Sequence, residues 1–286
     1  MPAKPLTDKI VSLIDHLPPM PNNIIRLRKA AADPNVNFNQ LVPILKEDPG
    51  LCADILHIAN SAFYGVHHTV DTIDEAVRYF GVEHLIEFVS VSFSEKTVKK
   101  FFHHVKNLND YFDHSRQIST AAYLLAKHAK KSVHEQNQFA IAGLLHDIGR
   151  LVIMMVSEGL ECESKLSQKI LPSWDSLAKM VRDEKQVIGI DHCEIGMKIC
   201  RKWEFPNPLV DAIYRHHTPL EGELHKEAAF ILTAHFLSMK DFPETMLCKL
   251  LPADIMKELA LTVDILHETR EDFFDKWQGK QLAPDF

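Results

Sequence analysis

Residues 139–156 read Phe139-Ala-Ile-Ala-Gly-Leu-Leu-His-Asp-Ile-Gly-Arg-Leu-Val-Ile-Met-Met-Val156, an apolar run that His146 and Asp147 interrupt. Burying a polar group without a partner costs about 2–7 kcal/mol, and burying an unpaired charge costs more. The fold must therefore supply partners for this imidazole and this carboxylate. A divalent metal ion would satisfy both side chains, because histidine nitrogens and carboxylate oxygens are common metal ligands.

Length and composition restrict the class of protein. The chain has 286 residues, of which 46% are hydrophobic, enough for a large core in one domain or in two lobes. A net charge of -7 argues against an extended nucleic-acid-binding surface, so we expect no nucleic-acid partner. His146, Asp147 and Arg150 break the longest apolar run, and residues 1–8 lack the apolar core of a secretory signal. We therefore expect a cytoplasmic protein without a membrane segment.

The cysteines are scattered and form no Cys-x-x-Cys pair, which favours reduced thiols over a zinc knuckle or a redox motif. We interpret Cys193, which follows His192 directly, as a core residue and not as a ligand. The five cysteines are Cys52, Cys162, Cys193, Cys200 and Cys248.

Helical periodicity dominates the sequence. Residues 73–80 carry apolar side chains at positions i, i+3, i+4 and i+7, after the capping box Thr72-x-x-Glu75 and before Gly81. This pattern predicts a complete helix, and its repetition predicts an all-α fold. The same spacing recurs over residues 38–45, 51–62 and, in competition with a strand-like alternation, 87–93.

A polar, weakly periodic stretch at residues 106–110 separates two halves of different character. The first half has no evident catalytic group, whereas the second half carries the His-Asp pair. We predict a lobe boundary here, with an N-terminal helical lobe over 1–108 and a second lobe over 109–286. The first lobe is interpreted as an interaction platform.

Histidine is frequent in this chain, with seventeen residues. A single histidine on the apolar stripe of a helix is usually a core residue, and His128 is interpreted in this way. His114, however, shares its stripe with Ile118 and Leu125, and four other helical segments also place an imidazole on their apolar face. This repetition indicates a shared site for one or two ions of Zn, Fe, Mn, Ni or Co. The predicted metal ligands are His114, His146, Asp147, His192, His216, His217 and His235.

Such a site suits phosphoester hydrolysis, because a metal lowers the pKa of its bound water to about 7 and so supplies hydroxide. Asp147 is the candidate catalytic residue, which would hold the metal and orient the attacking water. Arg150 has two interpretations, a cation that receives phosphate or a residue that caps the C-terminus of its helix or pairs with a surface acid. The chain has no Gly-x-x-x-x-Gly-Lys, Gly-x-Gly-x-x-Gly or Gly-x-Ser-x-Gly motif, which argues against those enzyme classes.

The chain carries four spaced motifs in order: Leu17-Pro-Pro-Met-Pro21; Asp48-Pro-Gly-Leu51 leading into Ala59-Asn-Ser-Ala62; Gly143-Leu-Leu-His-Asp-Ile-Gly149; and Gly189-Ile-Asp-His-Cys-Glu-Ile-Gly196 followed by Trp203-Glu-Phe-Pro206 and His216-His217. Together they resemble the HDOD (HD-related output domain) branch of the HD superfamily of metal-dependent phosphohydrolases. The resemblance covers residues 15–240 and implies an all-helical, HD-like bundle with an additional N-terminal lobe. It also implies metal positions at His114, His146, Asp147, His192, His216 and His217.

The chain departs from hydrolytic HD proteins at one position. Those proteins close the site with an aspartate on a late helix, and the matching stretch, Phe230–Phe236, carries His235 instead. The resemblance therefore implies a bacterial signalling or regulatory protein that retains its metal site and acts by binding a signalling protein or a nucleotide. Two alternatives remain: a metal-dependent phosphohydrolase acting on a nucleotide, cyclic dinucleotide or other phosphoester, and a helical scaffold with core histidines.

Overall fold

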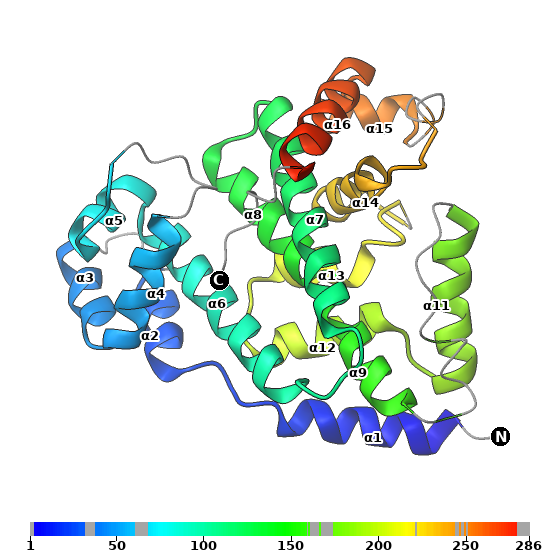
Figure 1. Cartoon of the computed structure of the whole chain (residues 1–286), viewed down its shortest axis with the longest axis horizontal. Coiled ribbons are helices and arrows are strands. Elements are labelled where there is room, and N and C mark those ends of the chain that lie inside the picture. Colours follow the sequence, from blue (N-terminus) through cyan, green and yellow to red (C-terminus); the bar gives the residue numbers. More distant parts are fainter. Residues whose placement is uncertain are drawn as a thin grey trace. The chain divides into compact units, whose positions relative to one another are not determined.

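The computed structural model describes residues 3–31, 38–60, 68–158, 174–220, 222–243 and 251–278, and the single positions 160, 166, 246 and 249. Regular secondary structure in these residues is entirely helical, which confirms the predicted all-α class (Figure 1). Contacts divide the chain into two units. We call them the histidine unit, Met1–Leu17 with His104–Lys280, and the N-terminal unit, which is mainly Pro18–His103.

The N-terminal unit contains the helix predicted over 73–80. Thr72 caps this helix by accepting a hydrogen bond from the Glu75 N–H, and Gly81 ends it with a φ of 80°. The Glu75 carboxylate accepts from the Asp71 N–H, one residue before the predicted partner Thr72. The described helices of this unit are α2 (Asn22–Ala31), α3 (Phe38–Lys46), α4 (Pro49–Ala59), α5 (Ile73–Phe80) and α6 (Val82–Phe101).

Three other helix predictions fall in the same unit, and the one over 38–45 corresponds to α3. Residues 87–93 lie inside α6, so the helical interpretation is confirmed over the strand-like alternation. The predicted helix over 51–62 corresponds to α4, which Asp48 caps by accepting hydrogen bonds from two main-chain N–H groups. Its predicted last residues, 61 and 62, lie outside the described residues.

The described helices of the histidine unit are α1 (Ala3–His16), α7 (Leu108–His128), α8 (Val133–Leu145), α9 (Ile148–Ser157), α11 (Trp174–Ile188), α12 (His192–Lys202), α13 (Asn207–Arg215), α14 (Lys226–Ser238), α15 (Ala253–Glu258) and α16 (Val263–Gln278). Helix α7 is central and packs against α8, α14 and α16. Its predicted apolar stripe is buried, because Ile118 and Leu125 are both 0% exposed. Phe139 of α8 stacks on Phe230 of α14, with ring centroids 4.2 Å apart.

The units differ from the predicted lobes of 1–108 and 109–286 mainly in the place of α1. This helix belongs to the histidine unit, where it packs against α9, α11 and α12 and buries Ile10 and Ile14. The border between the units lies at residues 103 and 104. Periodicity reveals that α1 has an apolar face, but contacts far along the chain decide which core buries that face.

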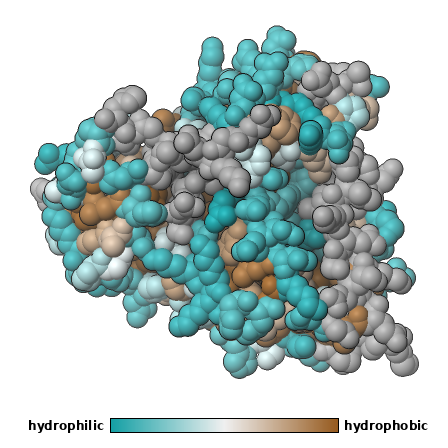
Figure 2. All heavy atoms as spheres, viewed as in Figure 1, coloured by the Kyte–Doolittle hydropathy of each residue, from teal (hydrophilic) through white to brown (hydrophobic). Residues whose placement is uncertain are grey.

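The apolar run that contains the His-Asp pair forms the core helices α8 and α9. Val133–Ser157 is long and apolar enough to cross a membrane by length and composition, but 83% of its most apolar window is buried inside the protein. Unlike this buried segment, helix α16 has one polar face and one buried apolar face. Hydrophilic residues cover it at the top of the view in Figure 2, while its Leu266 and Phe273 are each 1% exposed.

Helices α9 and α12 approach each other closely at Gly149. A Cβ atom at this residue would lie 2.0 Å from the carbonyl oxygen of His192 and 2.7 Å from the main-chain nitrogen of Gly196. Only a residue without a side chain fits such a contact. The close approach brings the start of α12 against the start of α9, which positions His192 beside Asp147.

We expect Gly149→Ala to lower the free energy of unfolding by more than about 3 kcal/mol, because the added methyl group meets main-chain atoms that cannot rotate away. Urea unfolding followed by circular dichroism measures the change. Lys198→Ala, on the exposed face of α12, is the matched control and should change stability by no more than about 0.5 kcal/mol. Wild-type stability in Gly149→Ala would contradict the close contact of α9 with α12.

Candidate metal centre

The structure brings together all seven residues that the sequence predicts as metal ligands. They come from five places in the histidine unit, and several stand at helix ends. His114 lies in α7 and His235 in α14. The others are His146 at the end of α8, Asp147 at the start of α9, His192 as the first residue of α12, and His216 and His217 directly after α13.

Asp147 lies at the centre of the cluster and is 1% exposed. Its Oδ2 atom is 3.6 Å from Nε2 of His114 and 3.6 Å from Nε2 of His146. Its Oδ1 atom is 3.4 Å from Nε2 of His192 and 3.7 Å from Nε2 of His216. The two oxygens of one carboxylate thus face two different sets of imidazoles.

The donor atoms form two groups, each gathered within 4.8 Å. The first group contains His192, His216 and His217 together with the thiol of Cys193, and the second contains His114, His146 and His235. A third set of the same compactness, His146, Asp147 and His216, joins the two groups. The arrangement therefore offers places for one or two ions around a shared carboxylate.

Hydrogen bonds fix three of the imidazole rings. Nδ1 of His146 donates to the carbonyl oxygen of Gly143 over 2.7 Å, and Nδ1 of His216 donates to that of Ile213 over 2.7 Å. Nδ1 of His192 donates to Oε2 of Glu184 over 2.6 Å. Because Nδ1 carries the proton in each neutral ring, Nε2 presents a lone pair to the centre of the cluster.

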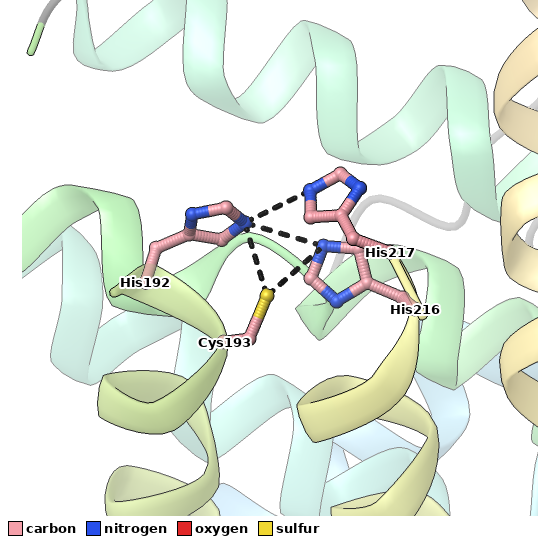
Figure 3. A group of neighbouring side chains, drawn as sticks. All are labelled: His192, Cys193, His216 and His217. Atoms are coloured by element: carbon pink, nitrogen blue, oxygen red, sulfur yellow. Dashed lines mark hydrogen bonds between the residues drawn. The ribbon is translucent and has the colours of Figure 1, made fainter. Parts of the chain in front are cut away.

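These lone pairs face one another at short range. Nε2 of His192 is 3.3 Å from Nε2 of His216 and 3.0 Å from Nε2 of His217 (Figure 3). Among the described residues, Oδ1 of Asp147 and Nε2 of His114 and His146 are buried without a hydrogen-bond partner. A cation, either a proton or a metal ion, is needed to satisfy so many buried acceptors that face one another. The nitrogen and oxygen donors suit a divalent transition metal.

Charge separates the rings into two classes. Burial lowers the pKa of His114 to about 4 and that of His146 to about 3, and it lowers the pKa values of His217 and His235 well below the usual value. Burial acts in the same direction on His216, but Cys193 and Asp147 outweigh it and raise that pKa to about 9. The first four rings are therefore neutral at pH 7 with lone pairs available. Cys193 and Glu184 outweigh burial at His192 as well and raise its pKa well above the usual value, so His192 and His216 lie where the site attracts a cation, either a proton or a metal ion.

Glu184 is a site residue that the sequence analysis missed. It lies in α11, is 1% exposed, and accepts hydrogen bonds from both Nδ1 and the main-chain N–H of His192. Carboxylates behind ligating histidines commonly orient the ring in this way. A signal was present, because Glu184 is four residues before the buried Ile188 and so lies on the apolar stripe of its helix.

Arg150 and His128, the two other polar residues considered in the sequence analysis, each have an acidic partner in the structure. Nη1 of Arg150 lies 3.3 Å from Oδ2 of Asp147, so this arginine pairs with the buried acid of the cluster and not with a surface acid as the sequence suggested. His128 lies outside the cluster, where its Nε2 is 3.1 Å from Oδ2 of Asp272. Arg150 therefore offers positive charge at the edge of the site. His128, with its side chain 22% exposed beside Asp272, is half-buried and is not the core residue predicted from the sequence.

We expect Glu184→Ala to lower the free energy of unfolding by about 2 kcal/mol or more, because two donors of His192 lose their acceptor in a buried place. Chemical denaturation measures the loss. Glu194→Ala removes a partly exposed carboxylate on α12 that lies 3.7 Å from Lys198, and we expect a change within about 1 kcal/mol. Equal losses in the two variants would argue against the proposed support of His192.

Comparison with known proteins yields one curated relative and several solved structures. An uncharacterised protein of Treponema pallidum is 26% identical over 241 residues, which cover 82% of this chain and 44% of the relative. The chain thus spans less than half the length of that relative. A protein from Shewanella amazonensis described as a candidate phosphohydrolase is 25% identical, with a TM-score of 0.67 and coverage of 96% of this chain and 98% of that one.

A candidate signal transduction protein from Marinobacter aquaeolei has the same fold. It is 20% identical with a TM-score of 0.66, and the match covers 96% of this chain and 64% of that one. The family model of the HDOD domain matches residues 17–219. Because this match spans more than two thirds of the chain, the protein belongs to the HDOD domain family.

Proposed function

We propose that this protein is a bacterial signalling or regulatory HDOD protein that retains a metal site and acts by binding a ligand or a protein. The observation that carries the proposal is the contact between Nε2 of His192 and Nε2 of His216, 3.3 Å apart, with Oδ1 of Asp147 beside them. Hydrogen bonds to Nδ1 aim both lone pairs inward. This preorganisation for a cation supports a retained metal site.

The charge of the donor set favours binding over hydrolysis. Asp147 is the one carboxylate among the described residues that faces the Nε2 atoms of both histidine groups, since Glu184 lies behind His192. His235 packs beside His114 and His146, with ring centroids 5.1 and 5.9 Å away, where hydrolytic relatives carry an aspartate. A neutral imidazole compensates less metal charge than a carboxylate, so a second divalent ion is held less firmly.

The proposed partner is a signalling protein or a nucleotide. The N-terminal unit supports this view, because it adds five described helices that supply none of the seven clustered residues. A helical unit of this size provides surface for recognition. The match to a candidate signal transduction protein agrees with such a role at the level of the fold.

Phosphoester hydrolysis is the second candidate function, and one observation favours it. Asp147 directs one oxygen to each histidine group, and Arg150 lies beside it with its side chain 13% exposed. A divalent metal bound there would supply an activated hydroxide near neutral pH. In that case Asp147 orients the attacking water, and Arg150 holds the phosphate of a nucleotide, cyclic dinucleotide or other phosphoester.

We expect the wild-type protein, purified without chelators, to contain a stoichiometric divalent transition metal, measured by mass spectrometry of the elements. Asp147→Ala should lose most of that metal, because it removes the charged donor shared by both groups. Asp211→Ala, which changes an exposed aspartate on α13, should retain it. A wild-type protein that stays metal-free after incubation with Zn, Fe, Mn, Co and Ni salts would refute the proposal.

The same preparations separate regulation from catalysis. We expect the metal-loaded wild type to hydrolyse nucleotide and cyclic dinucleotide substrates no faster than Asp147→Ala, because His235 replaces the closing aspartate. Phosphate release and chromatography of the products measure turnover. Hydrolysis that Asp147→Ala abolishes and Asp211→Ala preserves would establish the second candidate function in place of the first.

A further inference from the structure

Cys193 lies within the first histidine group. Its side chain is in the first turn of α12 and is 4% exposed. Its Sγ atom is 3.4 Å from Nε2 of His192 and 4.0 Å from Nε2 of His216, and Figure 3 shows the sulfur directed towards these nitrogens. The sequence suggested only a core residue, but a core role alone requires no such contacts.

Four separations among these donor atoms fit a tetrahedral coordination shell. Zinc bonds to nitrogen measure about 2.0–2.1 Å and those to sulfur about 2.3 Å, so tetrahedral ligands lie about 3.3 Å apart for two nitrogens and about 3.6 Å apart for nitrogen and sulfur. The two measured Nε2 separations around His192 are 3.3 and 3.0 Å. The two separations from Sγ are 3.4 and 4.0 Å, which bracket the expected value.

A second observation points to a cation at this place. Oδ1 of Asp147 is buried, has no hydrogen-bond partner among the described residues, and lies 3.4 Å from Nε2 of His192. It therefore points at the same nitrogens as the sulfur. A site where a thiol, a carboxylate oxygen and three imidazoles converge has the donors of a transition-metal site and not of a hydrophobic core.

We propose that the Cys193 thiolate is a metal ligand, which completes a four-donor site with His192, His216 and His217 for a thiophilic divalent ion such as Zn(II). The inference rests on the proposed metal centre and specifies one half of it. The S–H proton leaves to solvent when the sulfur–metal bond forms. The thiolate adds a negative charge to the metal centre. This charge compensates for the one that is missing because His235 stands in place of an aspartate.

Four protein donors have a functional consequence. A tetrahedral ion held by four side chains is typical of structural sites, whereas catalytic zinc sites keep one position for water. The first group would therefore tie the start of α12 to the end of α13. Oδ1 of Asp147 stays beside the first group, whereas its Oδ2 faces His114 and His146, so the second group remains available for a second ion or an anionic ligand.

Cobalt substitution tests the proposal directly, because a thiolate ligand gives Co(II) an intense near-ultraviolet charge-transfer band. We expect this band in the wild type loaded with Co(II), and its loss in Cys193→Ser while the visible cobalt bands remain. Cys200→Ser is the matched control, since Cys200 is buried in the same helix but lies outside this group of donors. That variant should keep both sets of bands.

Affinity and X-ray absorption provide independent readouts. We expect Cys193→Ser to weaken Zn(II) binding by at least about tenfold, a loss no smaller than that of an outer-shell partner, and to leave Mn(II) binding unchanged. X-ray absorption at the zinc edge of the wild type should show sulfur at about 2.3 Å beside nitrogen at about 2.0 Å. This measurement needs no variant, so it decides the question even if Cys193→Ser does not fold.

The outcomes separate this inference from the proposed function. Zinc bound by nitrogen and oxygen alone, or a charge-transfer band that persists in Cys193→Ser, would overturn the role of Cys193 and leave the metal centre intact. A wild-type protein that binds neither zinc nor cobalt would overturn both. Loss of the band in Cys193→Ser, together with a sulfur signal in the wild type, would support both.

Discussion

The burial of Asp147 among imidazole nitrogens governs the histidine unit. A carboxylate that is 1% exposed requires compensating positive charge, and Arg150 lies near one of its oxygens. The other oxygen faces the lone pairs of His192 and His216, which are acceptors themselves. The fold holds these groups together because Gly149 lets α9 and α12 pack at main-chain distance. Burial of the surrounding apolar core offsets the free-energy cost of assembling such a site, and a bound cation would stabilise the folded protein further.

The rings are oriented mainly by the ends of helices. His146 follows α8 and His216 follows α13, and each donates from Nδ1 to the carbonyl oxygen three residues earlier in its own helix. Those carbonyls lack partners in the last turn of a helix, so the bond satisfies an acceptor and fixes a ligand at once. His192 stands at the start of α12, and its Nδ1 donates a hydrogen bond to the carboxylate of Glu184, which orients the ring in the same way. Main chain and second-layer side chains thus preorganise the donors before any ion binds.

The composition of the donor set bears on what such a centre does. Six imidazoles and one carboxylate would neutralise little of the charge of a bound metal, and a thiolate at Cys193 would change that balance on one side of Asp147. A site saturated by protein donors would favour a structural ion and would leave the opposite side open to a second ion or an anionic ligand.

The sequence alone determined the helical class, the helix at residues 73–80 and the seven residues that cluster, because periodicity and capping are local and because apolar stripes report which faces are buried. It did not determine that α1 joins the histidine unit, that Glu184 supports His192, or that the Cys193 sulfur points at two imidazoles. Each of these depends on how helices distant in the chain dock. Side-chain spacing within one helix fixes a face, whereas distances between faces are set only by the packing of the whole core.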